Sequence, residues 1–311
     1  MLAEDFPRNS VEFERRFSTE EACRKYLADQ RWPDGYRCPR CHHDQGWTIE
    51  SRNLIQCASC DHQTSLTAGT LMHGSKKPLT IWFKVIWLFT TSKAGLSAKA
   101  LQRQLGFSYQ TAWCWMQKLR RAMVCEGREP LTGRVEVDVT KLHGEVPKRF
   151  PSRLMPVQIA VEDRGKHMGR VRMQALPDES AATLTPSLKE VIEAGATVHT
   201  DGWSGYTGVE EAGFVHEVDV IGSDRSASLD LFPLVHRVAS LVQRWLLGAY
   251  QGAVTSKHLQ HYLEEYTFRF NRRSSRHPGK IFMRLVQQAV VTRAKTYREI
   301  AEETPPYLVA T

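Results

Sequence analysis

The spacing of apolar positions divides the chain at residues 127–133, a short linker with a glycine at each end. Before the linker, apolar residues recur at the three- and four-residue intervals of amphipathic helices. After it, they first alternate with polar residues, as in strands. The pattern beyond the linker predicts strands at 134–142, 156–162, 169–176, 196–200 and 214–220, and longer helices at 179–193, 234–248 and 256–272.

The order of these elements indicates an α/β fold class. Consecutive strands with short connections form antiparallel hairpins, whereas strands that follow a helix join the same sheet in parallel. Three strands followed by alternating helices and strands is the order of a ribonuclease-H-like domain, the type that retroviral integrases share. In that topology the first and fourth strands are neighbours.

The region before the linker is predicted to be helical. Ser18, with Glu21 three residues later, has the spacing of a capping box and predicts a helix in a short lead-in. The apolar run 79–89 follows Pro78, and a proline is tolerated in the first turn of a helix. This run is too short to cross a membrane, so it predicts a buried helix.

Residues 97–123 have the pattern of a helix-turn-helix. Gly106 interrupts two helical runs, and Ser108 is placed to cap the second. The second helix would read DNA, whereas a plain helical hairpin with a solvated basic face is the alternative. The predicted DNA-binding positions, expected to be exposed, are Tyr109, Gln110, Gln117, Lys118, Arg120 and Arg121.

Four cysteines form the pattern C-x2-C-x15-C-x2-C, which presents four thiolates to one structural zinc ion. Two disulfides are the alternative, but they require an oxidising compartment, and the sequence has no recognisable secretory signal. Between the cysteine pairs, Trp47, Ile49, Leu54 and Ile55 predict a small hairpin. The cysteines are Cys38, Cys41, Cys57 and Cys60.

The charge of the chain favours a nucleic-acid partner. There are 42 Lys and Arg residues against 34 Asp and Glu, which gives a formal net charge of +8 and a pI of about 9.2. No acidic residue occurs in the 64 positions from His62 to Cys125. A surface that faces phosphates excludes carboxylates by repulsion, so this stretch predicts contact with DNA. The hydrophobic content of 41% is enough for a folded core.

Two aspartates are candidates for a second metal site. Asp138 lies inside the first predicted strand, where a buried charge is costly unless it is compensated. Asp201 ends the fourth strand, a neighbour of the first, so both carboxylates can point at one cation. Oxygen ligands of this kind suit Mg2+ or Mn2+. The alternative is that Asp138 forms a salt bridge and Asp201 only caps the following helix.

Six short motifs carry a family resemblance: CPRC at 38–41, LTAGT at 66–70, VEVD at 135–138, TDG at 200–202, HL at 258–259 and FRFNRR at 268–273. With them the chain resembles the zinc-ribbon DDE transposases of bacterial insertion sequences, the ISXO-like group, from about residue 13 to 290. The resemblance implies a ribonuclease-H-like catalytic core that acts on terminal inverted repeats. It also implies that Asp138 and Asp201 are the first two ligands of the catalytic metals.

The resemblance places His236 in the third ligand position, where the family usually has glutamate. Seven residues later, Gln243 replaces the usual lysine on the same helix face and is the DNA-binding position expected there. An imidazole ligates divalent ions but adds no negative charge, so the protein would supply −2 rather than −3, and Mn2+ would be tolerated better than Mg2+. Alternatively, His236 is a surface histidine. The carboxylates that could substitute are Glu136, Asp224 and Asp230.

Two functions are compatible with these residues. The first is an active DDE- or DDH-type transposase that cleaves and transfers DNA strands with two metal ions. The second is a catalytically decayed, transposase-derived DNA-binding protein, acting as a repressor or remaining as a remnant. In either case Arg269, Arg272 and Arg273 are expected along the DNA backbone, with a solvated helix face as the alternative.

The remaining expectations concern partners, location and domain limits. We expect double-stranded DNA as partner, both as terminal inverted repeats and as target, and a homodimer or higher homo-oligomer because two ends must be joined. We expect a cytoplasmic, nucleoid-associated bacterial protein without membrane contact. The expected regions are a helical lead-in at 1–37, a zinc ribbon at 38–66, a helix-turn-helix region at 67–126, the transposase domain at 134–290 and a tail at 291–311.

Overall fold

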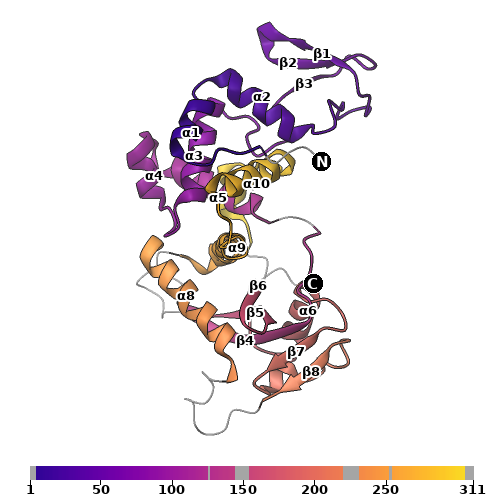
Figure 1. The fold of residues 1–311 in the computed structure, drawn as a ribbon, viewed down its shortest axis with the longest axis vertical. Coiled ribbons are helices and arrows are strands. Elements are labelled where there is room, and N and C mark those ends of the chain that lie inside the picture. Colours follow the sequence, from indigo (N-terminus) through magenta and orange to yellow (C-terminus); the bar gives the residue numbers. More distant parts are fainter. Residues whose placement is uncertain (1–4, 125–126, 144–153, 220–230, 252–253, 305–311) are drawn as a thin grey trace. The chain divides into compact units, whose positions relative to one another are not determined.

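The computed structural model describes residues 5–124, 127–143, 154–219, 231–251 and 254–304 (Figure 1). The chain forms two compact units. Unit 1 comprises Met1–Cys125 and Ser274–Ala301, and unit 2 comprises Glu126–Arg273 and Glu302–Thr311. Unit 2 therefore ends its main segment at Arg273, whereas the sequence places the end of the transposase domain at 290. Among the described helices, none combines the length and the apolar character that a membrane span requires.

Unit 1 contains a small antiparallel sheet and a group of helices. In the sheet, Trp47 pairs with Gln56 and Ile49 with Leu54, so the predicted hairpin is confirmed. The strands are β1 (Gly46–Ile49), β2 (Leu54–Cys57) and β3 (Gln63–Ser65). The helices are α1 (Ser10–Arg16), α2 (Glu20–Arg31), α3 (Leu79–Thr91), α4 (Ala98–Leu105), α5 (Tyr109–Ala122), α10 (Pro278–Val291) and α11 (Tyr297–Glu302).

The core of unit 1 is built around α3, the helix predicted from the apolar run 79–89. Phe83 is fully buried and meets Phe282 of α10 at 5.6 Å between ring centroids. Helix α10 also contacts α2 and α5, so a segment far along the sequence completes this core. The predicted cap at Ser18 is wrong by one residue. Thr19 accepts the hydrogen bond from the Ala22 N–H, so Glu20 begins α2 and its side chain is free to reach α3.

Unit 2 contains a five-stranded sheet in the order β6-β5-β4-β7-β8. The pairs β4·β5 and β5·β6 are antiparallel, and β4·β7 and β7·β8 are parallel, as the element order predicted. The strands are β4 (Arg134–His143), β5 (Leu154–Arg164), β6 (His167–Ala175), β7 (Thr197–Thr200) and β8 (Val215–Val218). The helices are α6 (Ala181–Val191), α8 (Pro233–Tyr250) and α9 (Leu259–Phe270).

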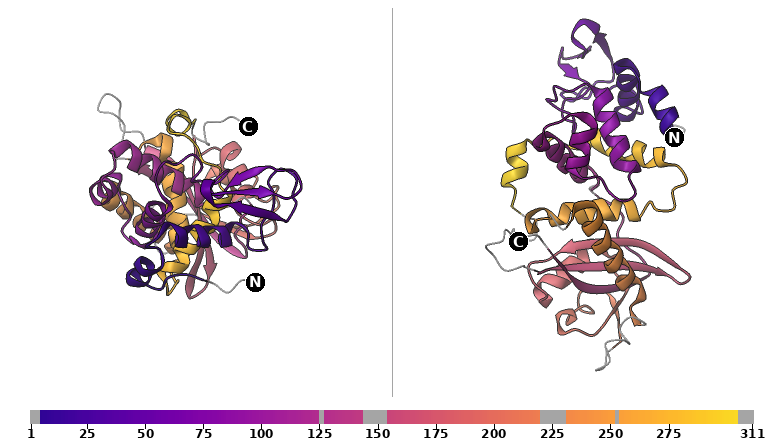
Figure 2. Two further views of the ribbon diagram at one scale, coloured as in Figure 1. Left: turned by 90° about the horizontal axis from the view of Figure 1, so that it is seen from above. Right: turned by 90° about the vertical axis from the view of Figure 1, so that its left-hand side faces the viewer.

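Helices cover both faces of this sheet (Figure 2). The core on one face joins β5 and β6 to α8 and α9. The core on the other face joins β4 and β7 to α6 and includes Val135 and Val137. Side chains alternate along a strand, so Glu136 and Asp138 of β4 lie on the opposite face, toward α8. The polar residues of β4 therefore share a face with the helix that carries His236.

Candidate functional site

The four cysteines lie together in the ribbon of unit 1. Their sulfur atoms are all within 4.8 Å of one another, and two pairs, Cys38 with Cys60 and Cys41 with Cys57, are separated by 3.6 Å. Four thiolates at about 2.3 Å from a tetrahedral zinc ion are about 3.8 Å apart, so the site has the dimensions of a zinc centre with four cysteine ligands. Each close pair joins one cysteine of the first motif to one cysteine of the second, as a single ion shared by both motifs requires.

The two cysteine motifs adopt the same backbone turn. The Cys38 N–H donates to the His43 carbonyl at 2.9 Å, and the Cys57 N–H donates to the His62 carbonyl at 3.0 Å. In each turn the residue after the second cysteine has a left-handed conformation, with φ of 61° at His42 and 56° at Asp61. These matching turns bring four sulfurs together in a region whose strands are too short for a hydrophobic core.

Asp138 and Asp201 lie at corresponding positions on adjacent strands. In the parallel β4·β7 ladder, Arg134 pairs with Thr197 and Glu136 with His199. The same offset of 63 residues places Asp138 level with Asp201, one residue beyond the end of β7. Corresponding residues on neighbouring strands point to the same face. The register therefore directs both carboxylates toward one side of the sheet.

The electrostatic surroundings of Asp138 contain the other two predicted ligands. Burial raises the pKa of Asp138, the hydrogen bond from the Val139 N–H lowers it, and the nearby charges of Asp201 and His236 then raise and lower it, respectively. The Val139 N–H lies 2.7 Å from Asp138 Oδ1, and the Trp203 N–H lies 3.0 Å from Asp201 Oδ1. Each aspartate thus has one oxygen oriented by the backbone.

His236 lies in the first turns of α8 and is half-buried. Gln243, two turns later, is exposed, and its predicted contact with DNA remains a prediction. Within the described parts of the chain, the four cysteines are the only group of three or more metal-ligating residues whose ligand atoms all lie within 4.8 Å. His236, the proposed third ligand, thus lies near Asp138, but its ring nitrogens and the oxygens of the two aspartates do not all lie within 4.8 Å of one another. Asp224 and Asp230, two alternatives for the third ligand, lie outside the described residues.

Glu136, the other alternative, is hydrogen-bonded to helix α8. Its Oε1 atom accepts the Val235 N–H at 2.7 Å, and its side chain is buried. Burial raises the pKa of Glu136 to about 7, against the lowering effect of the Val235 and Leu234 N–H groups. A carboxylate that satisfies the free N–H groups of a first helical turn fixes that turn. Glu136 therefore holds the start of the helix that carries His236.

Two residues near the aspartates were missed by sequence reasoning. Glu179 precedes α6 and is one of the charges that raise the pKa of Asp138. Tyr206 is 2% exposed, and its hydroxyl has no hydrogen-bond partner among the described residues. Burial raises the pKa of Tyr206, and Asp138, Asp201 and Glu179 raise it further. The sequence pattern places Glu179 at the start of a helix, whereas it lies just before α6, and Tyr206 ends a short 3-10 helix, Ser204–Tyr206, in the polar TDGWSGY segment.

The second helix of the predicted helix-turn-helix is less exposed than expected. Helix α5 has the predicted cap, because Ser108 accepts the Thr111 N–H, and Ser97 caps α4 by accepting the Ala100 N–H. The prediction that Gln117 and Arg120 are exposed is wrong, because their exposed fractions are 0% and 1%. Helix α10 packs against α5, and Arg120 lies over the Phe89 ring at 5.7 Å.

The other predicted DNA-binding positions of α5 remain accessible to different extents. Tyr109 is 51% exposed and Gln110 is exposed, both in the first turn. Lys118 and Arg121 are half-buried, and Arg121 donates to the Gln117 carbonyl at 2.9 Å. The accessible face of α5 is therefore concentrated at its N-terminal end.

The arginines of the FRFNRR motif bind within unit 2. Arg269 donates to buried Glu265 at 2.7 Å, and Arg273 donates to the Gly169 carbonyl at 3.2 Å. Arg272 lies 3.9 Å from the centre of the Phe268 ring. These contacts hold the end of α9 in place. The predicted role of the three arginines along DNA remains a prediction.

Each of the two units contains a segment that matches a known family of transposase domains. Residues 130–271 match the family model of the ISXO2-like transposase domain, and residues 18–63 match that of the transposase zinc-ribbon domain. The resemblance inferred from the sequence motifs is confirmed. The chain carries the zinc ribbon and the DDE domain of an insertion-sequence transposase.

A curated relative matches almost end to end. The chain is 26% identical over 300 residues to the "Uncharacterized protein in transposable element ISH50" of Halobacterium salinarum, covering 89% of this chain and 99% of that protein. A chain in the cryo-EM structure of the simian T-cell lymphotropic virus intasome in complex with PP2A regulatory subunit B56 gamma is 12% identical. That match covers 57% of this chain and 66% of the other, with a TM-score of 0.31, and is too distant to define the fold.

Proposed function

We propose that this protein binds the terminal inverted repeats of its insertion sequence and catalyses metal-dependent cleavage and transfer of DNA strands. The observation that carries this proposal is the register of β4 and β7, which places Asp138 level with Asp201. Neighbouring carboxylates on one side of a sheet edge are suitable ligands for a divalent ion. His236, on the helix that covers this face, is the proposed third ligand.

We infer a ribonuclease-H-like fold for unit 2. Three antiparallel strands are followed by two strands in parallel, and β4 is the central strand of the sheet. A helix before β7 packs on one face, and the helices after β8 pack on the other. In this arrangement the first and fourth strands of the domain are adjacent, so residues 63 positions apart in the sequence lie on neighbouring strands.

The residues of the site have distinct proposed roles. Mg2+ or Mn2+ bound here would activate the attacking hydroxyl group for in-line displacement and stabilise the departing oxyanion. Asp138 and Asp201 would bind the ions through the carboxylate oxygens that the backbone leaves free. His236 would bind through a neutral ring nitrogen. Glu136 would act as a positioning residue, because it anchors the first turn of α8 from the same strand that carries Asp138.

The charge of this ligand set favours manganese. Asp138 and Asp201 supply −2, and a neutral His236 adds nothing to it. Mg2+ is a hard ion that depends on oxygen ligands, whereas Mn2+ accepts an imidazole more readily. We therefore expect a larger ratio of Mn2+- to Mg2+-supported activity than a set of three carboxylates would give.

DNA binding is assigned to unit 1. Its helices α4 and α5 are joined by the short turn at Gly106, and the exposed first turn of α5 presents Tyr109 and Gln110. The segment from His62 to Cys125, which includes both helices, has no acidic residue. We propose that this pair acts as the helix-turn-helix and that the protein works as a homodimer or larger assembly, because two element ends must be joined.

The test of the proposed activity is strand nicking. Purified protein is incubated with a duplex that carries the element's inverted repeat, in Mn2+ and separately in Mg2+, and the products are resolved on a denaturing gel. Asp138→Ala and Asp201→Ala should reduce nicking to background. Glu210→Gln, which removes one exposed negative charge from the same unit, should leave it unchanged. Equal background cleavage by the parent protein and Asp138→Ala would contradict the catalytic proposal.

A second function is favoured by the departures at the third ligand. His236 stands in place of glutamate and Gln243 in place of lysine, and the three proposed ligands do not all lie within 4.8 Å of one another. A protein that kept DNA binding but lost catalysis would act as a repressor or persist as a remnant. Binding of the inverted repeat without metal-dependent nicking would support this function over the first.

A further inference from the structure

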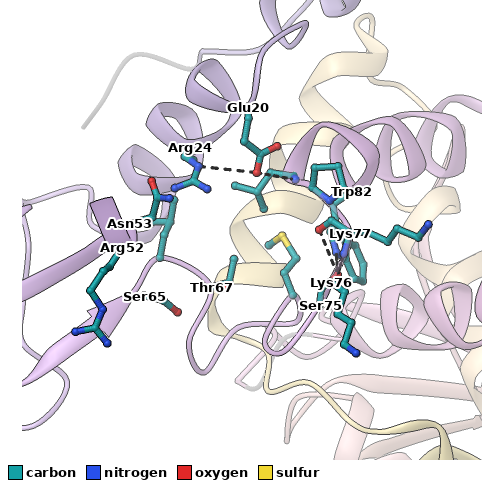
Figure 3. A pocket seen from close by; sticks show the side chains of 14 residues that line it. Glu20, Arg24, Arg52, Asn53, Ser65, Thr67, Ser75, Lys76, Lys77 and Trp82 are labelled. Atoms are coloured by element: carbon teal, nitrogen blue, oxygen red, sulfur yellow. Dashed lines mark hydrogen bonds and ion pairs between the residues drawn. The ribbon is translucent and has the colours of Figure 1, made fainter. Parts of the chain in front are cut away.

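A polar pocket in unit 1 has no role in the metal chemistry. It has a volume of about 430 Å3 and lies between α2, the β1–β2 connection and the end of β3 in the ribbon, and the segment that leads into α3 (Figure 3). Its charged lining residues are Glu20, Arg24, Arg52, Lys76 and Lys77. Four cations against one anion make this a candidate site for a negatively charged partner.

The one acid of the pocket is engaged with the protein. Glu20 accepts the Leu79 N–H at 3.0 Å and the Thr80 N–H at 3.2 Å, which are free donors of the first turn of α3. Arg24 lies 3.9 Å from the same carboxylate. Glu20 therefore caps α3 and shapes the wall of the pocket, while Arg52, Lys76 and Lys77 carry positive charge that this carboxylate does not neutralise.

The turn that carries Lys76 and Lys77 is held by hydrogen bonds and by ring stacking. Ser75 Oγ accepts the indole N–H of Trp82 at 2.9 Å and the backbone N–H of Lys77 at 3.2 Å. Trp82 in turn stacks on Trp115 of α5, with ring centroids 3.5 Å apart and planes 9° from parallel. Lys76 and Lys77 thus extend from a fixed turn, which reduces the entropy that a flexible loop would lose on binding.

Lys77 links the pocket to the helix pair α4–α5. The Lys77 ammonium group lies 5.7 Å from the centre of the Phe107 ring. Phe107 belongs to the turn between α4 and α5, directly before the cap Ser108 and the exposed residues Tyr109 and Gln110. A polyanion that contacts the start of α5 therefore has Lys77 of the pocket next to it.

We propose that this basic pocket binds backbone phosphates of double-stranded DNA and anchors the duplex beside α5. The proposal rests on the proposed function, since it adds a contact surface for the same DNA. Lysine and arginine contacts to phosphates position a protein without reading the sequence. The pocket should therefore contribute equally to cognate and unrelated duplexes, whereas Tyr109 and Gln110 are placed to distinguish between them.

The test measures DNA affinity of the full-length, zinc-loaded protein by fluorescence anisotropy. The probes are a fluorescent inverted-repeat duplex and a scrambled duplex, in buffer without divalent ions, at salt concentrations between about 50 and 200 mM. The variant is Lys76→Ala/Lys77→Ala. The matched control is Arg15→Ala/Lys25→Ala, which removes two exposed cations of the same unit that lie outside both the pocket and the acid-free segment 62–125. Lys76→Arg/Lys77→Arg keeps the charge.

Each lost phosphate contact should lower affinity by roughly 8-fold at 0.1 M salt and reduce the slope of log affinity against log salt by about 0.9. The Lys76→Ala/Lys77→Ala variant should therefore lose up to about 60-fold on both duplexes and about 1.8 of the slope. The arginine variant should retain parental affinity. Inorganic phosphate, added at constant ionic strength, should not displace the duplex.

Equal affinity and slope for Lys76→Ala/Lys77→Ala and the Arg15→Ala/Lys25→Ala control would overturn the proposal. Displacement of DNA by inorganic phosphate from the parent but not from the variant would assign the pocket to a small anion and overturn it as well. Nicking is scored separately in Mn2+. If the parent protein binds DNA as expected but does not nick it, this result counts against the catalytic function. The phosphate contact is then still established by the affinity measurements.

Discussion

The contact between Glu136 and helix α8 leads to a prediction about stability and its dependence on pH. Glu136 is 2% exposed and accepts the Val235 N–H at 2.7 Å. Replacement with alanine leaves a buried donor without a partner, which costs about 1–3 kcal/mol, and opens a cavity in addition. We expect Glu136→Ala to lower the free energy of unfolding by about 2–4 kcal/mol.

The Glu136→Gln variant separates the hydrogen bond from the charge. Glutamine keeps an acceptor for the Val235 N–H but cannot ionise. In the parent, burial raises the pKa of Glu136 from 4.5 to about 7. The folded state therefore holds the proton between these values, and stability falls as pH rises through this window. Between about pH 5.5 and 8.5 the parent should lose about 2 kcal/mol relative to Glu136→Gln.

The assay is urea unfolding of the whole protein at several pH values. Tryptophan fluorescence and circular dichroism monitor the unfolding transition of unit 2. Parent and variants are compared at equal zinc loading, so that any effect of pH on the ribbon cancels in the difference. An unchanged difference between the parent and Glu136→Gln across this pH range would refute the buried, raised-pKa carboxyl group. Equal stability of Glu136→Ala and Glu136→Gln would refute the hydrogen bond to α8.

Three further predictions concern the metal sites and a buried ion pair. Cys57→Ser should abolish zinc binding, seen as loss of one zinc per chain by mass spectrometry, and expose the ribbon to trypsin. Arg128→Ala removes hydrogen bonds of 2.6 and 3.1 Å to buried Glu264 and should cost about 3 kcal/mol in urea unfolding. His236→Glu restores a third negative charge and should raise the Mg2+-to-Mn2+ nicking ratio by about tenfold. An unchanged ratio would exclude His236 as a ligand.

The strand order of unit 2 and the ribbon were predictable from the sequence because both rest on local patterns. Alternation along 134–142 marks β4, and the cysteine spacing marks the two turns of the ribbon. The neighbouring positions of Asp138 and Asp201 follow from the topology that these elements adopt. Local periodicity and turn chemistry therefore account for the most specific features of the candidate site.

Other features depend on contacts between distant segments. Gln117 and Arg120 have the polar character of surface residues, yet α10, more than 150 positions later, packs on their helix. Glu136 was a candidate metal ligand because strand alternation places it on the same face as Asp138, but its carboxylate accepts a hydrogen bond from α8 instead. Tyr206 ends a 3-10 helix of three residues, which is too short for a periodic pattern to indicate burial. Such contacts arise from tertiary packing, which single-sequence patterns do not encode.

Manganese binding by the protein is the most direct test of the central claim that Asp138, Asp201 and His236 form one metal site. Electron paramagnetic resonance of Mn2+, titrated into zinc-loaded protein, reports the free ion and therefore the amount bound. The parent should bind Mn2+ saturably, and Asp138→Asn/Asp201→Asn should leave the ion free at the same concentrations. Identical binding curves for the parent and this variant would contradict the site.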